Sequence, residues 1–434
     1  LQAYAMDMLT MRRSSSLRVV YDTWFDRFYK ISIPGLTAQL DAAAEVGCEV
    51  FVVDAGWYGA GGGNWHEMIG DWRENPDVFS EMSLTRFADL VRSKGLEFGI
   101  WMEPERVHAS APVLGDHPDW FLPSREDGFY YPDLVKPEAR DWVLSEMSRV
   151  IDTYGVKWLD LDCNFDFSDD PYHTGHRLRT EAWHSILDSL AEAYPDLILE
   201  GCASGGLRND LCELSHCHTH FLTDTVDPID TIRIGMAGSS RLWPAMMFRW
   251  AVVYPTGGGF TPYGREPSDT GDLVLCPANA TSDKVSSYYL DFAIRSAMTG
   301  GLGLGGNIAG LGDETRRQLK EHVAFYKRHR EFILSSVAIP ITPIEPVEKR
   351  DGTSAIQLSS RDFKRNMVFV YNMSSNTDPV RAVPVGLQPE STYSVASEEG
   401  TDLCKRMSGE DILTNGVEVE CPPNRARVIC VNAV

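Results

Sequence analysis

The chain has 434 residues, of which 43% are hydrophobic and 24% are charged, and its formal net charge at pH 7 is −22. This composition is typical of a globular protein with a sizeable core and excludes a disordered chain. A negative charge of this size repels phosphate backbones and anionic lipid surfaces, so we expect neither nucleic acid nor a membrane as a partner.

Short β-rich runs alternate with longer segments of helical spacing through the first half of the chain. The predicted strands cover residues 17–21, 50–54, 97–102, 156–162 and 197–200. The predicted helices cover residues 33–46, 84–94, 137–154 and 178–194. This alternation predicts βαβ units and a parallel sheet.

Polar residues follow these strands at their C-terminal ends. The pairs are Asp22 and Trp24, Asp54 and Trp57, Glu103 and Glu105, Asp160 and Asp162, Glu200 and Cys202, and Thr223 and Asp224. Apolar strands with acidic ends predict an α/β fold of the (β/α)8 TIM-barrel type, whose active site lies at that face. A doubly wound sheet would gather its ligands at a single switch point, and no glycine-rich phosphate motif follows the first strand.

From about Ile339 onward, strand-like runs alternate with turn signals and no long helix is expected. This pattern predicts a small antiparallel β-sandwich. We therefore expect a catalytic barrel over residues 1–338 and a C-terminal antiparallel β domain over residues 339–434. The Gly-rich stretch 256–282 is expected to be a barrel loop, and the glycines at 300–306 are expected to end the eighth strand.

The cysteines and the ends of the chain bear on its location. Nine cysteines are scattered with no CxxC pair, which favours free thiols over a disulfide framework. No apolar run is long enough for a membrane span, and the first residues lack the basic and apolar regions of a signal peptide. A cytoplasmic location is favoured, although the chain begins without Met and an N-terminal domain could have been removed.

Six segments resemble glycoside hydrolase family 36, the α-galactosidase and α-N-acetylgalactosaminidase group, and they occur in that family's order. They are FVVDAGW from Phe51, GDW from Gly70, GIWMEPE from Gly99, WLDLDCN from Trp158, EGCASGG from Glu200 and TDTVD from Thr223. HPDW from His117 adds a seventh match. The resemblance covers roughly residues 17–335 and implies a retaining α-glycosidase with a carbohydrate substrate and no metal or organic cofactor.

The resemblance also implies the catalytic residues. Asp162 matches the family's nucleophile, the Asp of a D-x-N motif, and Asp224 matches the family's acid/base. In retaining glycosidases these two carboxyl groups lie about 5–5.5 Å apart. One of them must be ionised while the other is protonated. The competing interpretation, without the flanking motifs, is that both carboxylates cap helices or pair with Arg.

Sugar-binding roles follow from the same resemblance. They fall on Asp54, Trp57, Trp72, Asp160, Cys202, Ser204, Gly205 and Arg208. Asp54 would bind sugar hydroxyls, and Trp57 and Trp72 would form apolar walls, unless these Trp residues belong to the core. The segment 202–206 would line the space near C2, and Arg208 would bind a hydroxyl or orient a carboxylate.

The chain departs from the family pattern within the sugar subsite. The usual Asp-Asp-Gly-Trp reads Asp54-Ala55-Gly56-Trp57, and Asp160 stands where the family has Lys. Thr223 replaces Ser before the acid/base, and the family's N-terminal β-sandwich does not appear in the sequence. An added carboxylate and a lost cation favour an amine-bearing sugar, so α-galactosaminide and α-N-acetylgalactosaminide join α-galactoside as candidate substrates.

Two other functions remain open at this point. One is a transglycosylase of the raffinose-synthase type, which would use a sugar hydroxyl instead of water. The other is a non-catalytic sugar-binding barrel. The aglycone is not determined by the sequence, and a homo-oligomer is compatible with it.

One further motif carries metal-binding residue types. His216, His218 and His220 alternate and would share one face of a strand, where they could ligate a metal. The competing interpretation is a loop that enters the sixth strand with partly buried imidazoles, and we expect no metal here.

Overall fold

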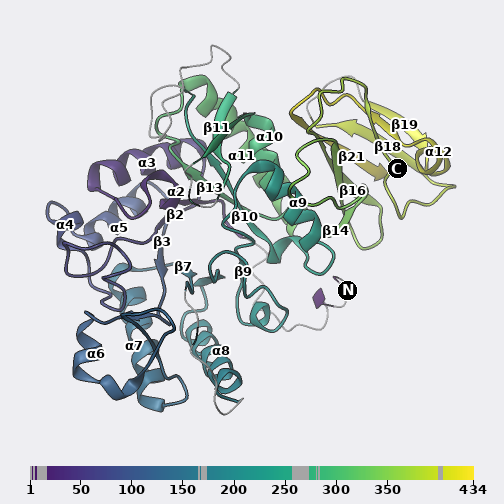
Figure 1. The fold of residues 1–434 in the computed structure, drawn as a ribbon. Coiled ribbons are helices and arrows are strands. Elements are labelled where there is room, and N and C mark those ends of the chain that lie inside the picture. The colour runs from purple at the N-terminus through teal and green to yellow at the C-terminus, as the bar shows by residue number, and fades with distance from the viewer. Residues whose placement is uncertain are drawn as a thin grey trace.

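The computed structural model describes residues 2, 5–6, 17–164, 167, 174–256, 273–279, 281, 284–398 and 404–434. Eight parallel strands form the predicted barrel (Figure 1). They are β1 (Val20–Asp22), β2 (Val50–Val53), β3 (Glu97–Met102), β7 (Trp158–Leu161), β8 (Ile198–Gly201), β9 (Thr219–His220), β10 (Phe248–Val253) and β13 (Gly301–Gly306). A parallel bridge between Phe221 and Phe248 brings β9 beside β10, so the two ends of the sheet meet.

Helices surround the barrel, as the alternating sequence pattern predicted (Figure 1). The longer ones are α3 (Ile33–Val46), α5 (Leu84–Ser93), α7 (Pro137–Tyr154), α8 (Gly175–Ala193), α9 (Pro228–Gly238), α10 (Leu290–Ala297) and α11 (Asp313–Ser335). Local signals set their ends. The Ser32 and Ser83 side chains cap the starts of α3 and α5, while α3 and α7 end at Gly47 and Gly155 in the left-handed conformation.

The glycine-rich segment 300–306 contains the eighth strand, β13, instead of merely ending it. A Cβ added at Gly301 would lie 2.5 Å from the Phe248 ring, and one added at Gly303 would lie 2.9 Å from the Phe248 and Trp250 rings. Aromatic side chains of β10 therefore occupy the space that side chains of β13 would need. A strand of this composition has no apolar alternation by which the sequence could show it.

Two additions extend the barrel. Between β3 and α7, the strands β4 (Val107–His108), β5 (Phe121–Pro123) and β6 (Phe129–Pro132) form an antiparallel sheet in the order β4-β6-β5. Between β10 and α10, β11 (Leu273–Pro277) and β12 (Val285–Tyr289) form a hairpin within and beyond the expected loop at 256–282. Residues 257–272 of that loop lie outside the described residues.

The C-terminal part is antiparallel, as predicted, and packs on the α9–α10 side of the barrel (Figure 1). One sheet contains β14 (Val337–Pro340), β15 (Thr353–Ser359), β16 (Arg365–Asn372), β21 (Arg425–Ala433), β18 (Thr392–Ser397) and β19 (Cys404–Ser408), in that spatial order. A second contains β17 (Val380–Ala382) and β20 (Val417–Val419). The Tyr371 hydroxyl donates to the carbonyl oxygen of Arg295 at 2.8 Å, which fastens this part to α10.

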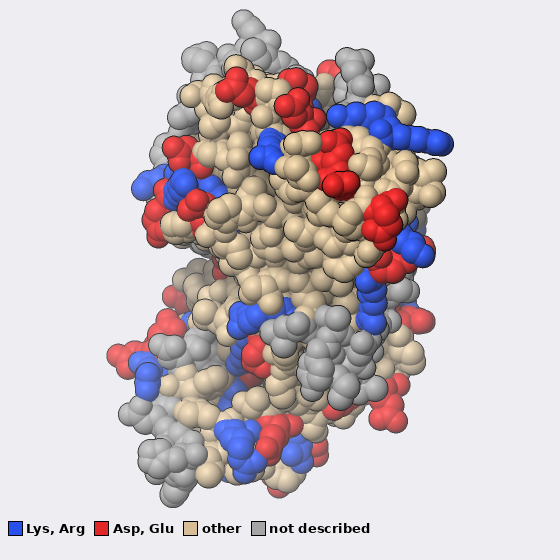
Figure 2. Space-filling view, turned by 90° about the vertical axis from the view of Figure 1, so that its right-hand side faces the viewer, with Lys and Arg blue, Asp and Glu red and all other residues tan. Residues whose placement is uncertain are grey.

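The exterior carries both signs of charge despite the net charge of −22. On the face shown in Figure 2, acidic and basic side chains lie interspersed around an uncharged band. All nine cysteines lie among the described residues, and none of them forms a disulfide bond. None of the described helices has the length and apolar character needed to cross a membrane.

Candidate active site

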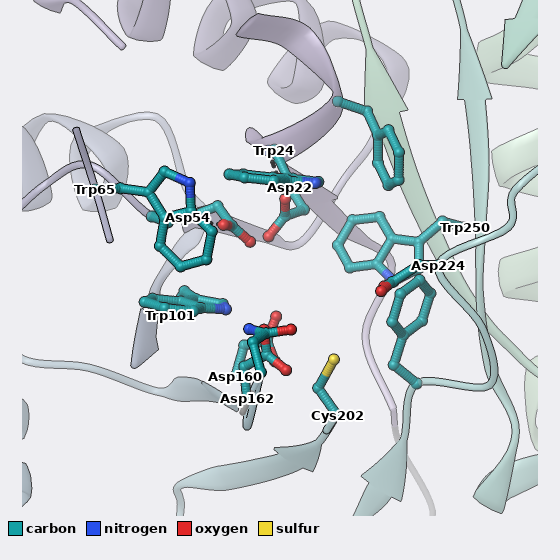
Figure 3. Close-up of a pocket in the computed structure, with 14 residues that line it drawn as sticks. Asp22, Trp24, Asp54, Trp65, Trp101, Asp160, Asp162, Cys202, Asp224 and Trp250 are labelled. Atoms are coloured by element: carbon teal, nitrogen blue, oxygen red, sulfur yellow. Dashed lines mark hydrogen bonds between the residues drawn. The ribbon is translucent and has the colours of Figure 1, made fainter. Parts of the chain in front are cut away.

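A cavity of about 560 Å³, measured to its open mouth, lies at the C-terminal ends of the barrel strands (Figure 3). Five aspartates line it: Asp22, Asp54, Asp160, Asp162 and Asp224. Six aromatic residues also line it: Trp24, Phe25, Trp65, Trp101, Phe221 and Trp250. The acidic strand ends predicted from the sequence therefore meet around one pocket whose walls are aromatic.

Asp162 follows β7 and is held by donors on both of its carboxylate oxygens. The backbone N–H groups of Cys163 and Ser204 donate to its Oδ1, each at 2.7 Å. The Asn164 side-chain amide donates to its Oδ2. Hydrogen bonds of this kind stabilise the ionised carboxylate and fix its orientation. The D-x-N motif thus supplies both the carboxylate and one of the groups that position it.

The segment after β8 connects Asp162 to Asp224. Ala203, Ser204 and Gly205 have φ values of 72°, 50° and 82°, so three consecutive residues lie in the left-handed region. Such a run costs free energy at the non-glycine positions and occurs where function fixes the backbone. The run presents the Ser204 N–H to Asp162, and a Cβ added at Gly205 would lie 2.7 Å from the backbone nitrogen of Asp224.

Asp224 lies across the pocket from Asp162 (Figure 3). Burial raises the pKa of Asp224 to about 7, and the nearby charge of Asp162 adds to this effect. The carboxyl group is therefore protonated in a substantial fraction of molecules near neutral pH. A carboxyl group that accepts hydrogen bonds on both oxygens thus faces one that can carry a proton, and acid/base chemistry needs two carboxyl groups in different environments.

The loop that carries Asp224 is anchored three residues later. The Asp227 carboxylate caps α9 by accepting from the N–H of Ile229 at 2.9 Å. It also accepts from the Tyr288 hydroxyl at 2.6 Å and pairs with Arg350, which lies between β14 and β15. A residue of the C-terminal part thus helps to hold the loop beside the pocket.

Three further carboxyl groups form the acidic floor of the pocket, which we define as Asp22, Asp54 and Asp160. Each offers an oxygen within 4.8 Å of the others, and their exposed fractions are 3%, 7% and 7%. Burial raises the pKa of Asp54 to about 8, with a further contribution from Asp162. Burial, followed by the charge of neighbouring carboxylates, also raises the pKa of Asp22 and of Asp160.

Arg208, expected to bind a hydroxyl or orient a carboxylate, contacts a carboxylate. It donates to Glu105 at 2.6 Å, and Arg179 pairs with the same carboxylate at 2.8 Å. Burial raises the pKa of Glu105, but the two guanidinium groups outweigh burial and hold that pKa below its usual value. Arg208 is not among the described residues that line the pocket.

Trp57 and Trp72, predicted to wall the sugar, are not brought to the pocket. Their exposed fractions are 0% and 1%, and their ring centroids lie 6.1 Å apart in the core. The Trp57 indole nitrogen donates to the carbonyl oxygen of Trp101 at 2.9 Å. Trp57 therefore lies in the core beside Trp101, and other aromatic residues form the walls of the pocket.

Some of the further lining residues have a signal in the sequence. Asp22 and Trp24 form the first strand-end pair, and Trp101 lies within a family motif, although the resemblance assigns none of them a sugar-binding role. Trp250 faces the pocket from β10, which sequence periodicity did not distinguish from a core position. Trp65 enters from the loop after β2, where no local pattern indicates it.

The alternating histidines do not form one cluster. His218 Nδ1 accepts from the N–H of Leu199, and His220 is buried in β9. His216 lies instead with His184 and Cys212, and the potential ligand atoms of these three lie within 4.8 Å of one another. This group and the acidic floor are the two places among the described residues whose side chains could hold a metal ion.

Comparison with known proteins gives one matching family. Residues 8–256, more than half of the chain, match the model of the Melibiase family. The α-galactosidase Mel36A of Lactobacillus acidophilus is 26% identical over 329 residues, which are 72% of this chain and 41% of that protein. The chain therefore spans less than half the length of this relative.

Solved structures share the fold. The galactosidase domain of the α-galactosidase–sucrose kinase AgaSK superposes with a TM-score of 0.79 at 22% identity, over 96% of this chain and 54% of that one. A variant of the α-galactosidase AgaA from Geobacillus stearothermophilus, in complex with raffinose, gives a TM-score of 0.77 at 20% identity over 96% and 55%. These likenesses extend over the barrel and the C-terminal sheets.

Proposed function

This chain belongs to the Melibiase family, glycoside hydrolase family 36, and from that premise we propose that its pocket hydrolyses terminal α-linked galacto-configured sugars with retention of configuration. The resemblance read from the sequence motifs is thereby confirmed at the level of the family. The relatives support the substrate class, since Mel36A is named an α-galactosidase and the AgaA variant holds raffinose. Because the chain covers only part of these proteins, its own activity is a proposal.

The proposal rests on the different environments of Asp162 and Asp224. Asp162 accepts hydrogen bonds on both oxygens, which suits a nucleophile that must be ionised. Burial raises the pKa of Asp224 to about 7, which suits a group that must give and take a proton. Two carboxyl groups with these separate properties are what a retaining glycosidase requires.

We assign the steps as follows. In the first step, an Asp162 oxygen attacks the anomeric carbon, the glycosidic bond breaks, and Asp224 gives its proton to the departing oxygen. The products of this step are a glycosyl ester on Asp162 and a free alcohol. In the second step, Asp224 takes a proton from water, the water oxygen attacks the anomeric carbon, and Asp162 leaves. Two inversions give net retention.

The strained segment after β8 would serve both steps. Its Ser204 N–H holds the nucleophile, and its small residues allow the backbone to approach the sugar. Cys202 lines the pocket from the same segment, beside the catalytic pair. Asp54 and Asp160 would bind the ring from the acidic floor. These contacts are compatible with galactoside, N-acetylgalactosaminide and galactosaminide substrates.

The test is hydrolysis of nitrophenyl α-glycosides by the purified chain. We expect release of nitrophenol from at least one α-galacto-configured glycoside, and none from the β-galactoside. Asp162→Asn should lower kcat by at least about 10³-fold while sugar binding persists. Asp196→Asn is the matched control, because this carboxylate is 87% exposed and remote from the chemistry.

Three outcomes would contradict the proposal. Unchanged turnover in Asp162→Asn would remove the nucleophile assignment. Binding of galacto-configured sugars with no turnover of any glycoside would favour a non-catalytic barrel. Products enlarged by an added sugar, when acceptor sugars are in excess, would instead identify a transglycosylase.

A further inference from the structure

The acidic floor of the pocket contains more carboxyl groups than the proposed reaction uses. Asp162 and Asp224 suffice for the two chemical steps, yet Asp22, Asp54 and Asp160 also reach the cavity (Figure 3). All three are more than nine-tenths buried, with potential ligand oxygens within 4.8 Å of one another. Placing three carboxyl groups together out of water is costly unless something compensates them.

The residues that the structure describes supply no compensating cation inside this pocket. Among the described lining residues, five are Asp and none is Lys, Arg or His. Arg208, the basic residue to which the sequence assigned a sugar-binding role, pairs with Glu105 instead. Within the described part of the chain, the floor therefore lacks the ion pair that buried carboxylates normally have.

Two oxygens of the floor are unpaired among the described groups. Asp160 Oδ1 and Asp22 Oδ2 are buried and accept no hydrogen bond there. On the neighbouring strand β8, Oε1 of the fully buried Glu200 is likewise without a partner among the described groups, while Glu200 Oε2 accepts from the Trp158 indole at 2.6 Å. A buried acceptor left without a donor costs about 1–3 kcal/mol, so its presence at a cavity indicates a ligand that donates to it.

We propose that Asp22, Asp54 and Asp160 bind an ammonium group carried by the sugar ring, so that the substrate is an α-linked amino sugar of galacto configuration. This inference rests on the proposed glycosidase function and narrows its substrate class. The ammonium group is attached to a carbon of the sugar other than the anomeric one, because the anomeric carbon faces Asp162.

An ammonium group matches the floor better than the neutral alternatives. It presents three N–H donors and a positive charge to three carboxyl groups. A hydroxyl presents one donor and no charge, and an acetamido group presents one N–H together with a carbonyl oxygen that carboxylates repel. Trp24, Trp65 and Trp101 line the same pocket, and aromatic rings attract cations.

A bound metal ion fits less well. Ca²⁺ takes six to eight oxygen ligands, and Mg²⁺ requires near-octahedral oxygen ligands with several waters. Beyond the aspartates, the pocket lining is mostly aromatic and offers few oxygen ligands. A substrate ammonium, in contrast, brings its own ring to lie against those aromatic walls.

The experiment compares nitrophenyl α-galactoside with four analogues in which an amine replaces the hydroxyl at carbon 2, 3, 4 or 6. We expect at least one amino sugar to exceed the neutral galactoside in kcat/KM by about tenfold or more. In Asp160→Asn, the ratio of kcat/KM for that amino sugar to kcat/KM for the galactoside should fall at least about tenfold. Loss of the carboxylate charge weakens binding of the charged sugar more than binding of the neutral one. Asp196→Asn, an exposed carboxylate, should leave the ratio unchanged.

The inference is overturned if kcat/KM for the neutral galactoside exceeds that for all four amino sugars. It is equally overturned if Asp160→Asn lowers kcat/KM for the neutral and the amino sugars by the same factor. It is also overturned if dialysis against EDTA abolishes activity and Ca²⁺ restores it, because the floor would then be a metal site. Cleavage of the neutral sugar alone would leave the proposed glycosidase function intact.

If no glycoside is cleaved, the glycosidase proposal fails while the cation site is still testable by calorimetry. Each of the four amino-deoxygalactoses, the amine at carbon 2, 3, 4 or 6, would be titrated beside galactose. At least one should bind more tightly than galactose, and Asp160→Asn should remove that difference. Equal binding of galactose and all four amino sugars would overturn the ammonium assignment by itself.

Discussion

The backbone N–H of Ser204 donates to Oδ1 of Asp162 at 2.7 Å, and the next residue, Gly205, abuts the backbone of Asp224. One short segment after β8 therefore contacts both residues to which we assign the chemistry. Three consecutive residues of this segment adopt the left-handed conformation, which costs free energy at Ala203 and Ser204 and lets the segment contact both Asp162 and Asp224.

This relationship makes Gly205 a position where a single methyl group should matter. Gly205→Ala places a Cβ 2.7 Å from the Asp224 nitrogen, at a φ of 82°, so Asp224 must shift. We expect kcat to fall by about 10²-fold or more, with the fold retained. Gly95→Ala is the matched control, because its φ is 84° and no atom lies within 4 Å of the added Cβ. Equal activity in both variants would argue against a shared positioning role.

The pH dependence of activity should report on Asp224. Burial raises the pKa of this acid to about 7, so the protonated form needed for the first step is lost as pH rises through 7. We expect kcat/KM to decline above about pH 7. In Asp224→Asn, an alkyl α-glycoside should lose far more activity than a dinitrophenyl α-glycoside, whose leaving group needs no proton.

Persistence of the same decline in the variant would contradict this assignment. It would point instead to another carboxyl group of raised pKa, such as Glu103, whose burial raises its pKa to about 8.

The acidic floor should make the protein less stable at high pH. Burial raises the pKa of Asp54 to about 8, above its value in the unfolded chain. The folded state then binds more protons, so this contribution to stability is complete below about pH 4 and is lost as pH rises through about 8. Asp54→Asn should flatten the decline of Tm between pH 5 and 9, and at pH 8 it should raise the free energy of unfolding by about 1–3 kcal/mol.

Because Asp54 also faces the sugar, the same variant should lose activity while it gains stability. The control is Asp196→Asn, which should change neither. A Tm that rises with pH in the unaltered protein would contradict the raised pKa values of the floor.

Arg350 should connect the C-terminal part to catalysis. Its guanidinium pairs with Asp227, which is fully buried and follows Asp224 by three residues. Arg350→Gln leaves this carboxylate without its cation, and we expect a loss of about 1–3 kcal/mol in unfolding free energy together with about a tenfold fall in kcat. Arg317→Gln, which removes exposed ion pairs on α11, should change kcat little.

A fall in Tm without any change in kcat would assign Arg350 a structural role only. The pH profile separates the two roles further, since a displaced Asp224 should also shift the decline near pH 7.

The fold was largely predictable, because apolar strands with acidic ends carry a periodic signal. The helices at 33–46 and 137–154 have the predicted bounds, since capping Ser or terminal Gly residues mark their ends. The strand β13 was misplaced, because its glycines show no alternation and their role depends on rings from β10. Contacts between residues far apart in the sequence, such as those between β13 and β10, produce no periodic pattern in the sequence.

The site was predictable in its carboxylates and less so in its aromatic residues. A carboxylate at a strand end is costly to bury in the apolar core, so it faces the pocket. A Trp side chain is as stable in the core as in the pocket wall. Trp57 and Trp101 lie after neighbouring strands, yet one is buried behind the other and only Trp101 reaches the cavity. That choice depends on packing between elements distant in sequence.

The most direct test of retention through Asp162 is the configuration of the sugar when it is first released. Proton NMR, recorded within the first minutes of hydrolysis of an α-glycoside, distinguishes the α and β anomers before they interconvert. Double displacement through Asp162 predicts that the α anomer appears first and the β anomer accumulates only by mutarotation. Initial release of the β anomer would contradict a covalent intermediate on Asp162 and would require direct attack by water.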